Sequence, residues 1–210
     1  MTTILKNNFK ALAFIALIFS AISFSTSASA TFNKEEAFIQ SLSDTALMSL
    51  TEKKVSRKTR EDRVREILNK NFDINTIGKF ALGLHWRTAS KNQKDEYLKL
   101  FENMIVETYT TRFEDYSGET LEVKKSVQSG KRDVLVESAV IQKDGPPLKL
   151  EWRVRKKNGS LRIIDVVVEG VSMSVTQRSD FASVIQSGGG DINALLKMLR
   201  ERKKADTKNS

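Results

Sequence analysis

The sequence predicts an α+β fold: a curved, mainly antiparallel sheet of about four strands, wrapped by amphipathic helices. Three observations lead to this prediction. Apolar residues recur at helical spacing up to about residue 116, they alternate with polar residues between about 119 and 169, and helical spacing returns from 176 to 199. A run of strands between two runs of helices is typical of α+β domains.

Residues 1–30 have the features of a cleavable secretory signal. Lys6 and Lys10 precede an apolar run from Ala11 to Phe24, and small residues follow up to Ala30. The alternative is a membrane anchor, but the run is shorter than the roughly 20 residues that a spanning helix needs. We therefore expect cleavage after Ala30, a single domain over residues 31–200, and a disordered polar tail over residues 201–210.

The chain contains no cysteine, so it has neither disulfides nor the modified cysteine of a bacterial lipoprotein. A soluble periplasmic protein of a Gram-negative bacterium fits this absence, and we expect a monomer. After the signal, 33 Lys and Arg face 26 Asp and Glu, a net charge of +7. In an exported protein this excess favours anionic lipid head groups or acidic proteins over nucleic acid as the partner, although solubility alone also explains it.

The first half of the exported chain predicts helices. Apolar residues at helical spacing predict one helix over residues 32–50 and a second that ends before Asp73. The glycines in the apolar stretch Ile77–Arg87 indicate close backbone approach to a neighbouring helix. Ser90 and Gln93 form a capping box that predicts the start of a long helix, which continues to about residue 116.

The second half predicts about four strands and two closing helices. Turn residues at 129–131, at 144–147 and at Asn158-Gly159 separate the strands. The third strand, 148–155, alternates strictly, whereas the fourth, Leu161–Glu169, is apolar on both faces and should lie deeper. Helical spacing then predicts helices over 176–186 and 191–199, separated by three glycines that end one helix before an Asp cap.

The sequence offers little for catalysis. One histidine, His85, and no cysteine exclude most nucleophile-base pairs and most transition-metal sites, so we expect neither an enzyme nor a cofactor nor a metal. Asp165 is the unusual polar residue within the fourth strand. It either pairs with an arginine such as Arg178 or marks a position that reaches the surface. The surplus of apolar helix faces against the sheet fits an apolar cavity, but the pattern alone favours an ordinary filled core, because periodicity does not distinguish a void from packing.

Particular residues resemble a known family, the MlaC-type or toluene-tolerance family of periplasmic phospholipid-binding proteins. The resemblance covers the exported chain. It includes Leu82-Gly83, Trp86-Arg87-Thr88-Ala89-Ser90, Gln93 and Phe101, the segment Asp165-Val166-x-Val168-Glu169-Gly170-Val171-Ser172, and Arg178-Ser179-x-Phe181. Gln177 stands where the family pattern has an aromatic residue.

The resemblance implies a deep pocket between sheet and helices that takes the acyl chains of a phospholipid and leaves its head group outside. It also implies partners, namely an outer-membrane lipoprotein-porin complex and an inner-membrane ABC transporter complex of the Mla type. The carrier would shuttle lipid between them and so maintain the asymmetry of the outer membrane. Head-group preference, the number of acyl chains and the direction of transport do not follow from the resemblance.

On this hypothesis we expect one set of residues to line the pocket and another to lie at its mouth. The lining set is Phe80, Leu84, Phe101, Ile105, Tyr109, Trp152, Val154, Ile164, Val166, Val168, Val171, Met173, Phe181 and Val184. The mouth set is Arg87 and Arg178, whose guanidinium groups could meet a phosphate or instead pair with Asp165 or Glu169. Two alternatives are a carrier of another apolar lipid, such as a hopanoid, and a non-catalytic periplasmic adaptor with a filled core.

Overall fold

The computed structural model describes residues 33–208, so the predicted signal over residues 1–30 lies outside the described residues. These residues belong to one compact unit. Five helices come first: α1 (Lys34–Leu50), α2 (Arg57–Asn71), α3 (Ile74–Leu82), α4 (His85–Thr88) and α5 (Lys91–Glu114). Five strands and two helices follow: β1 (Thr120–Ser129), β2 (Asp133–Ile141), β3 (Leu148–Lys157), β4 (Ser160–Val168), β5 (Val171–Ser172), α6 (Met173–Ser187) and α7 (Ile192–Lys208).

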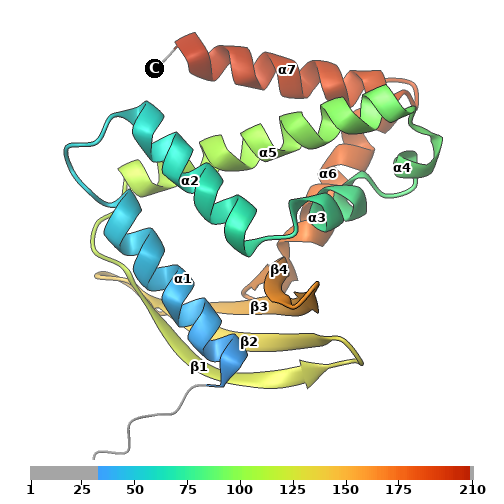
Figure 1. Ribbon diagram of the computed structural model, residues 1–210. Helices are drawn as coiled ribbons and strands as arrows, with labels where there is room; N and C mark the ends of the chain where they lie inside the picture. Colours follow the sequence, from blue (N-terminus) through green and yellow to red (C-terminus); the bar gives the residue numbers. More distant parts are fainter. Residues whose placement is uncertain (1–32, 209–210) are drawn as a thin grey trace, which may run out of the picture. The chain divides into compact units, whose positions relative to one another are not determined.

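The strands form one antiparallel sheet in the order β1-β2-β3-β4-β5. Figure 1 shows the long strands curving below α1, with the other helices on the same side of the sheet. Irregularities in the pairing of β1 with β2 and of β3 with β4 add to this curvature. The predicted α+β class is confirmed, and the sheet consists of the four predicted strands and the two-residue β5.

A bulge in β4 changes which of its residues share a face. Val154 pairs with Ile163 and Arg153 pairs with Asp165, so Ile164 is the extra residue. Because side chains alternate along a strand, this insertion places Ile163 on the same face as Val166. Ile163 is the residue of β4 that is fully buried, while residues 164–168 are partly exposed. The predicted depth of β4 is therefore found only in part: none of residues 161–168 is exposed, but Ile163 alone is fully buried.

Two hydrophobic clusters hold the domain together. One lies between α1 and the sheet and includes Ile39, Val136 and Ile163. The other joins the helices, and its centre is the aromatic trio Tyr97, Phe101 and Phe181, with ring centroids 5.7 to 6.0 Å apart. The helices and the sheet thus have separate cores.

The predicted glycine function in α3 is confirmed at Gly78. A Cβ atom at this position would lie 2.9 Å from the Leu98 side chain and 3.0 Å from the Phe101 ring. The Gly78 carbonyl also accepts a hydrogen bond of 2.9 Å from the buried Tyr97 hydroxyl. Glycine therefore lets α3 approach α5 closely.

The helix starts follow from local side-chain capping. Ser90 and Gln93 form the predicted capping box of α5, with hydrogen bonds of 3.2 Å and 2.9 Å. Helix α6 begins at Met173, three residues earlier than predicted. Its first amides are capped by Ser172 and by Asp165 of β4.

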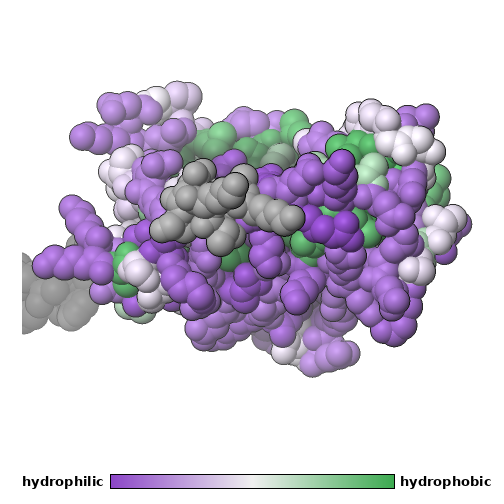
Figure 2. Space-filling view, turned by 90° about the horizontal axis from the view of Figure 1, so that it is seen from above, coloured by the Kyte–Doolittle hydropathy of each residue, from purple (hydrophilic) through white to green (hydrophobic). Residues whose placement is uncertain are grey.

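The predicted disorder of the tail from residue 201 is wrong for the described part, because α7 continues to Lys208. The charged residues of α7 bind α5: Arg200 forms a bidentate ion pair with Glu96 at 2.6 and 2.8 Å, and Arg202 donates a hydrogen bond to Thr108. Figure 2 shows the face that carries α7, seen from above, as mostly hydrophilic with separate hydrophobic patches. At least Arg202 of the predicted tail thus belongs to a helix that packs on α5.

Among residues 33–208, the structure contains no helix that is long and apolar enough to cross a membrane.

Candidate functional site

A cavity of about 290 Å³ lies between the helices and the last full strand of the sheet. It occupies the space between the helical core and the α1–sheet core. Its walls come from α2, α3, α5, β4 and α6. The lining residues are Leu68, Phe72, Ile74, Ile77, Phe101, Met104, Ile105, Thr108, Tyr109, Arg112, Asp165, Val166, Val168, Met173, Ser174, Thr176, Gln177 and Asp180.

The inner part of the cavity is apolar. Phe101 and Met104 of α5, which are 2 % and 8 % exposed, line the cavity together with Val166 and Val168 of β4. Met173 at the start of α6, which is 39 % exposed, adds a flexible thioether side chain nearer the surface. Such a surface favours a hydrocarbon ligand over a polar one.

Polar side chains gather at the outer part of the same cavity. Arg112 of α5 lies over the Tyr109 ring at 5.9 Å, and Gln177 and Asp180 come from α6. Neither Arg112 nor Asp180 has an ion-pair partner among the described residues. Desolvation raises the pKa of the Tyr109 phenol, and the charge of Arg112 opposes the rise. Its aromatic ring and hydroxyl give a ligand both an apolar and a polar contact.

Asp165 fastens β4 to the start of α6 at the side of the cavity. Its carboxylate accepts hydrogen bonds from the Ser172 hydroxyl at 2.6 Å and from the Ser174 amide at 3.0 Å. A carboxylate at a helix N-terminus satisfies free amides and interacts favourably with the helix dipole. The expected pairing of Asp165 with Arg178 is not found, and the Glu169 carboxylate accepts from the Lys149 amide instead.

The structure brings six of the expected lining residues together in this cavity: Phe101, Ile105, Tyr109, Val166, Val168 and Met173. The other eight lie elsewhere. Trp152 and Val154 belong to the α1–sheet core, and Phe181 and Val184 belong to the helical core. Ile164 is the bulged residue of β4, whereas Phe80, Leu84 and Val171 are 42 %, 68 % and 54 % exposed.

The expected mouth arginines do not line the cavity. Arg87 is exposed on α4, and the Arg178 guanidinium lies 5.4 Å from the centre of the Phe80 ring and beside Gly83. The arginine at the rim is Arg112, which sequence reasoning missed. One signal could have found it, because Arg112 follows Tyr109 by three positions on a helix and so shares its face.

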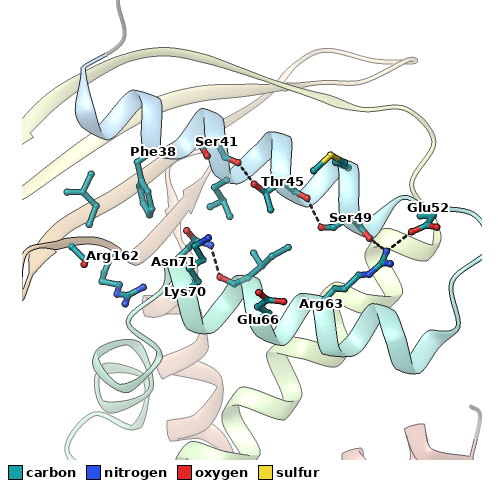
Figure 3. Close-up of a pocket in the computed structure, with 15 residues that line it drawn as sticks. Phe38, Ser41, Thr45, Ser49, Glu52, Arg63, Glu66, Lys70, Asn71 and Arg162 are labelled. Atoms are coloured by element: carbon teal, nitrogen blue, oxygen red, sulfur yellow. Dashed lines mark hydrogen bonds and ion pairs between the residues drawn. The ribbon is translucent and has the colours of Figure 1, made fainter.

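A second, larger groove of about 850 Å³ lies between α1 and α2 and does not have this apolar character. Figure 3 shows polar side chains along its walls. Thr45 and Ser49 donate hydrogen bonds back to the carbonyls of their own helix, and Arg63 binds the Ser49 carbonyl and Glu52. Lys70 and Arg162 complete a charged rim. Size alone would favour this groove, but its lining makes the smaller cavity the better site for a hydrocarbon chain.

No group of three or more metal-ligating residues occurs within residues 33–208. The buried Tyr97 phenol has its pKa raised by desolvation and donates to a carbonyl, which is a structural use of the hydroxyl. The arrangement around the cavity is suited to binding.

Comparison with known proteins gives the family. Residues 40–201 match the family described as MlaC protein. The chain belongs to the MlaC family. A curated relative, the intermembrane phospholipid transport system binding protein MlaC of Haemophilus influenzae, is 24 % identical over 132 residues. That match spans 61 % of this chain and 62 % of the relative.

The MlaC fold is also found in a solved structure. The phospholipid-binding protein from Ralstonia solanacearum, determined in complex with a phospholipid, superposes with a TM-score of 0.70 and 23 % sequence identity. The superposition covers 81 % of this chain and 97 % of that protein. The expected resemblance to the MlaC family is thus confirmed at the level of sequence family and fold.

Proposed function

We propose that this chain is a periplasmic phospholipid carrier. It binds the acyl chains of one phospholipid in the cavity between α3, α5, α6 and β4. It exchanges that lipid with an outer-membrane lipoprotein-porin complex and an inner-membrane ABC transporter complex of the Mla type, and so maintains outer-membrane lipid asymmetry. The carrier itself catalyses no reaction.

The observation that carries the proposal is the chemistry of the cavity, which is apolar inside and polar at its rim. A phospholipid has the same division between hydrocarbon and head group. The curated relative is named as a phospholipid transport binding protein, and the solved protein of the same fold was determined with a phospholipid. These names support lipid as the ligand class over a filled adaptor core.

The cavity must widen to accept a phospholipid. Its volume of about 290 Å³ is at the lower end of the roughly 300–1,000 Å³ of small-molecule pockets, and two acyl chains need more room. The helical core and the α1–sheet core are separate clusters that share few residues, among them Ile67 and Phe72. We therefore place the opening between these two cores.

Transfer requires contact with a partner. Burial of acyl chain gains about 0.8 kcal/mol per CH₂, so two chains of about fifteen carbons gain on the order of 20 kcal/mol over water. Release into water is negligible at this free energy. The partner must offer a comparably apolar site, and relative affinity or ATP hydrolysis by the transporter sets the direction.

The rim suits a head group that carries both signs of charge. The Arg112 guanidinium can bind a phosphate, and the Asp180 carboxylate can bind an ammonium group. Both groups lack an ion-pair partner among the described residues. Binding of a head group therefore need not break an existing ion pair. This arrangement favours a zwitterionic phospholipid.

A matched pair of substitutions tests the proposed site. Val168→Glu places a charge against the cavity, and Val127→Glu makes the same change on β1, at a half-exposed position away from the cavity. We expect lipid to be lost from Val168→Glu and kept by Val127→Glu, as measured by solvent extraction of the purified proteins. A folded Val168→Glu protein, by circular dichroism, that still carries lipid would refute the site.

A further inference from the structure

The corner between α3 and α4 exposes two large apolar side chains. Leu84 is 68 % exposed and Phe80 is 42 % exposed, and neither lines the lipid cavity. Single exposed apolar residues are common on protein surfaces, but two of them on one tight corner, where Gly83 turns the chain with φ +60°, need an explanation.

Four cations belong to this corner or contact its aromatic rings. Lys79 and Arg87 come from α3 and α4. Lys94 of α5 lies over the Trp86 ring, and Arg178 of α6 lies over the Phe80 ring. None of the four has a carboxylate within ion-pair distance among residues 33–208. The nearby Asp95 is bound by Lys91 at 2.5 Å, so it does not neutralise them. The corner therefore carries a local positive charge.

Trp86 contacts two of these cations. The ammonium groups of Lys79 and Lys94 lie 5.9 Å and 5.5 Å from the Trp86 ring centroid, and all three side chains line an open hollow of about 520 Å³. Two like charges held on one indole repel each other, so an anion between them would relieve the repulsion. A half-buried tryptophan with an apolar body and a polar edge is also typical of the water–bilayer boundary.

We propose that this corner, formed by Lys79, Phe80, Leu84, Trp86, Arg87, Lys94 and Arg178, docks the protein on the surface of an anionic lipid bilayer. Leu84 and Phe80 enter the boundary between head groups and acyl chains, and the cations bind lipid phosphates. The inference goes beyond lipid carriage, because the corner lies outside the cavity and needs no bound lipid. It gives the positive charge of the chain a specific location.

Vesicle sedimentation tests the proposal. The chain from Phe32 onward, which is a compact unit of its own, is mixed with vesicles of phosphatidylcholine alone or with about a third phosphatidylglycerol. We expect binding to the anionic vesicles, weak binding to the neutral ones, and release at about 0.5 M salt, where charges are screened. Equal binding to both vesicles, or binding to neither, would overturn the proposal. The second result would instead fit an acidic protein partner.

Substitutions locate the surface. Lys79→Gln with Lys94→Gln should weaken binding to anionic vesicles about 25-fold, from the typical contribution of a cation near such a surface. The control, Lys124→Gln with Lys149→Gln, removes the same charge from exposed positions on the sheet. Its affinity for anionic vesicles should fall by less than about threefold. Equal losses in the two double variants would show that net charge, and not this corner, drives binding, and would overturn the proposal.

Leu84→Ser tests the apolar contact. It should weaken binding several-fold while leaving the salt dependence unchanged. Val168→Glu, which removes lipid from the cavity, should bind anionic vesicles like the unmodified chain. Loss of vesicle binding and loss of cavity lipid can therefore be distinguished. An unchanged affinity of Leu84→Ser for anionic vesicles would contradict insertion of the corner into the bilayer.

Discussion

Asp165 of β4 accepts a hydrogen bond of 3.0 Å from the Ser174 amide in the first turn of α6. The same carboxylate accepts from the Ser172 hydroxyl, which in turn caps Val175. One acidic side chain thus joins the strand that forms one wall of the cavity to the helix that forms another. The position of α6 over the cavity depends on this contact.

Asp165→Ala should lower the free energy of unfolding by about 1–2 kcal/mol, because the first amides of α6 lose their acceptor. Asp165→Asn keeps an acceptor oxygen and should cost less. Urea unfolding followed by circular dichroism measures both. Equal losses for the two variants would show that the charge, and not the hydrogen bond, is what matters.

Sequence patterns predicted features that depend on near neighbours. The cap of α5 at Ser90, the turns of the sheet and the helix break at Gly188 follow from a few adjacent residues. The bulge at Ile164 did not follow, because it depends on pairing with β3. Six of the fourteen residues expected to line a pocket lie around one cavity, because helix faces and the alternation beyond the bulge are regular. A void between two cores depends on how distant side chains pack, and hydrophobic periodicity carries no information about that packing.

Arg112→Gln should change the head-group composition of the bound lipid more than the total amount of bound lipid. It removes the rim cation of the cavity and leaves the apolar wall intact. We expect the share of zwitterionic phospholipid in the extract to fall. Mass spectrometry of the extracted lipid measures this share, and Arg132→Gln at the β1–β2 turn is the control. The same head-group composition in both variants would show that Arg112 does not contact the lipid head group.

Gly188→Ala should destabilise the turn between α6 and α7. A Cβ at Gly188 would clash with the Ala194 side chain, and overpacking typically costs about 1–3 kcal/mol. Ala194→Gly removes the clashing atom, so adding Gly188→Ala in that background should cost little. Urea unfolding of the wild type, the two single variants and the double variant gives the coupling free energy between the two positions. Additive losses would contradict the clash.

The Asp133–Arg155 pair predicts a pH dependence of stability. Arg155 binds Asp133 at 2.6 and 2.9 Å and lowers the pKa of its carboxyl below the usual value. The stabilisation is complete above the unfolded carboxyl pKa of about 3.9 and is lost as pH falls through the lower folded value. Asp133→Asn should cost about 2 kcal/mol at neutral pH and little in acid. A penalty that persists in strong acid would contradict the assignment.

The central claim is that the cavity between α3, α5, α6 and β4 holds a phospholipid. Native mass spectrometry of the chain from Phe32 onward, purified without detergent, tests it most directly. We predict a protein peak shifted by the mass of one phospholipid, which collapses to the bare chain when the complex is activated in the gas phase and is absent from Val168→Glu. A wild-type protein that shows only the bare mass would contradict the account.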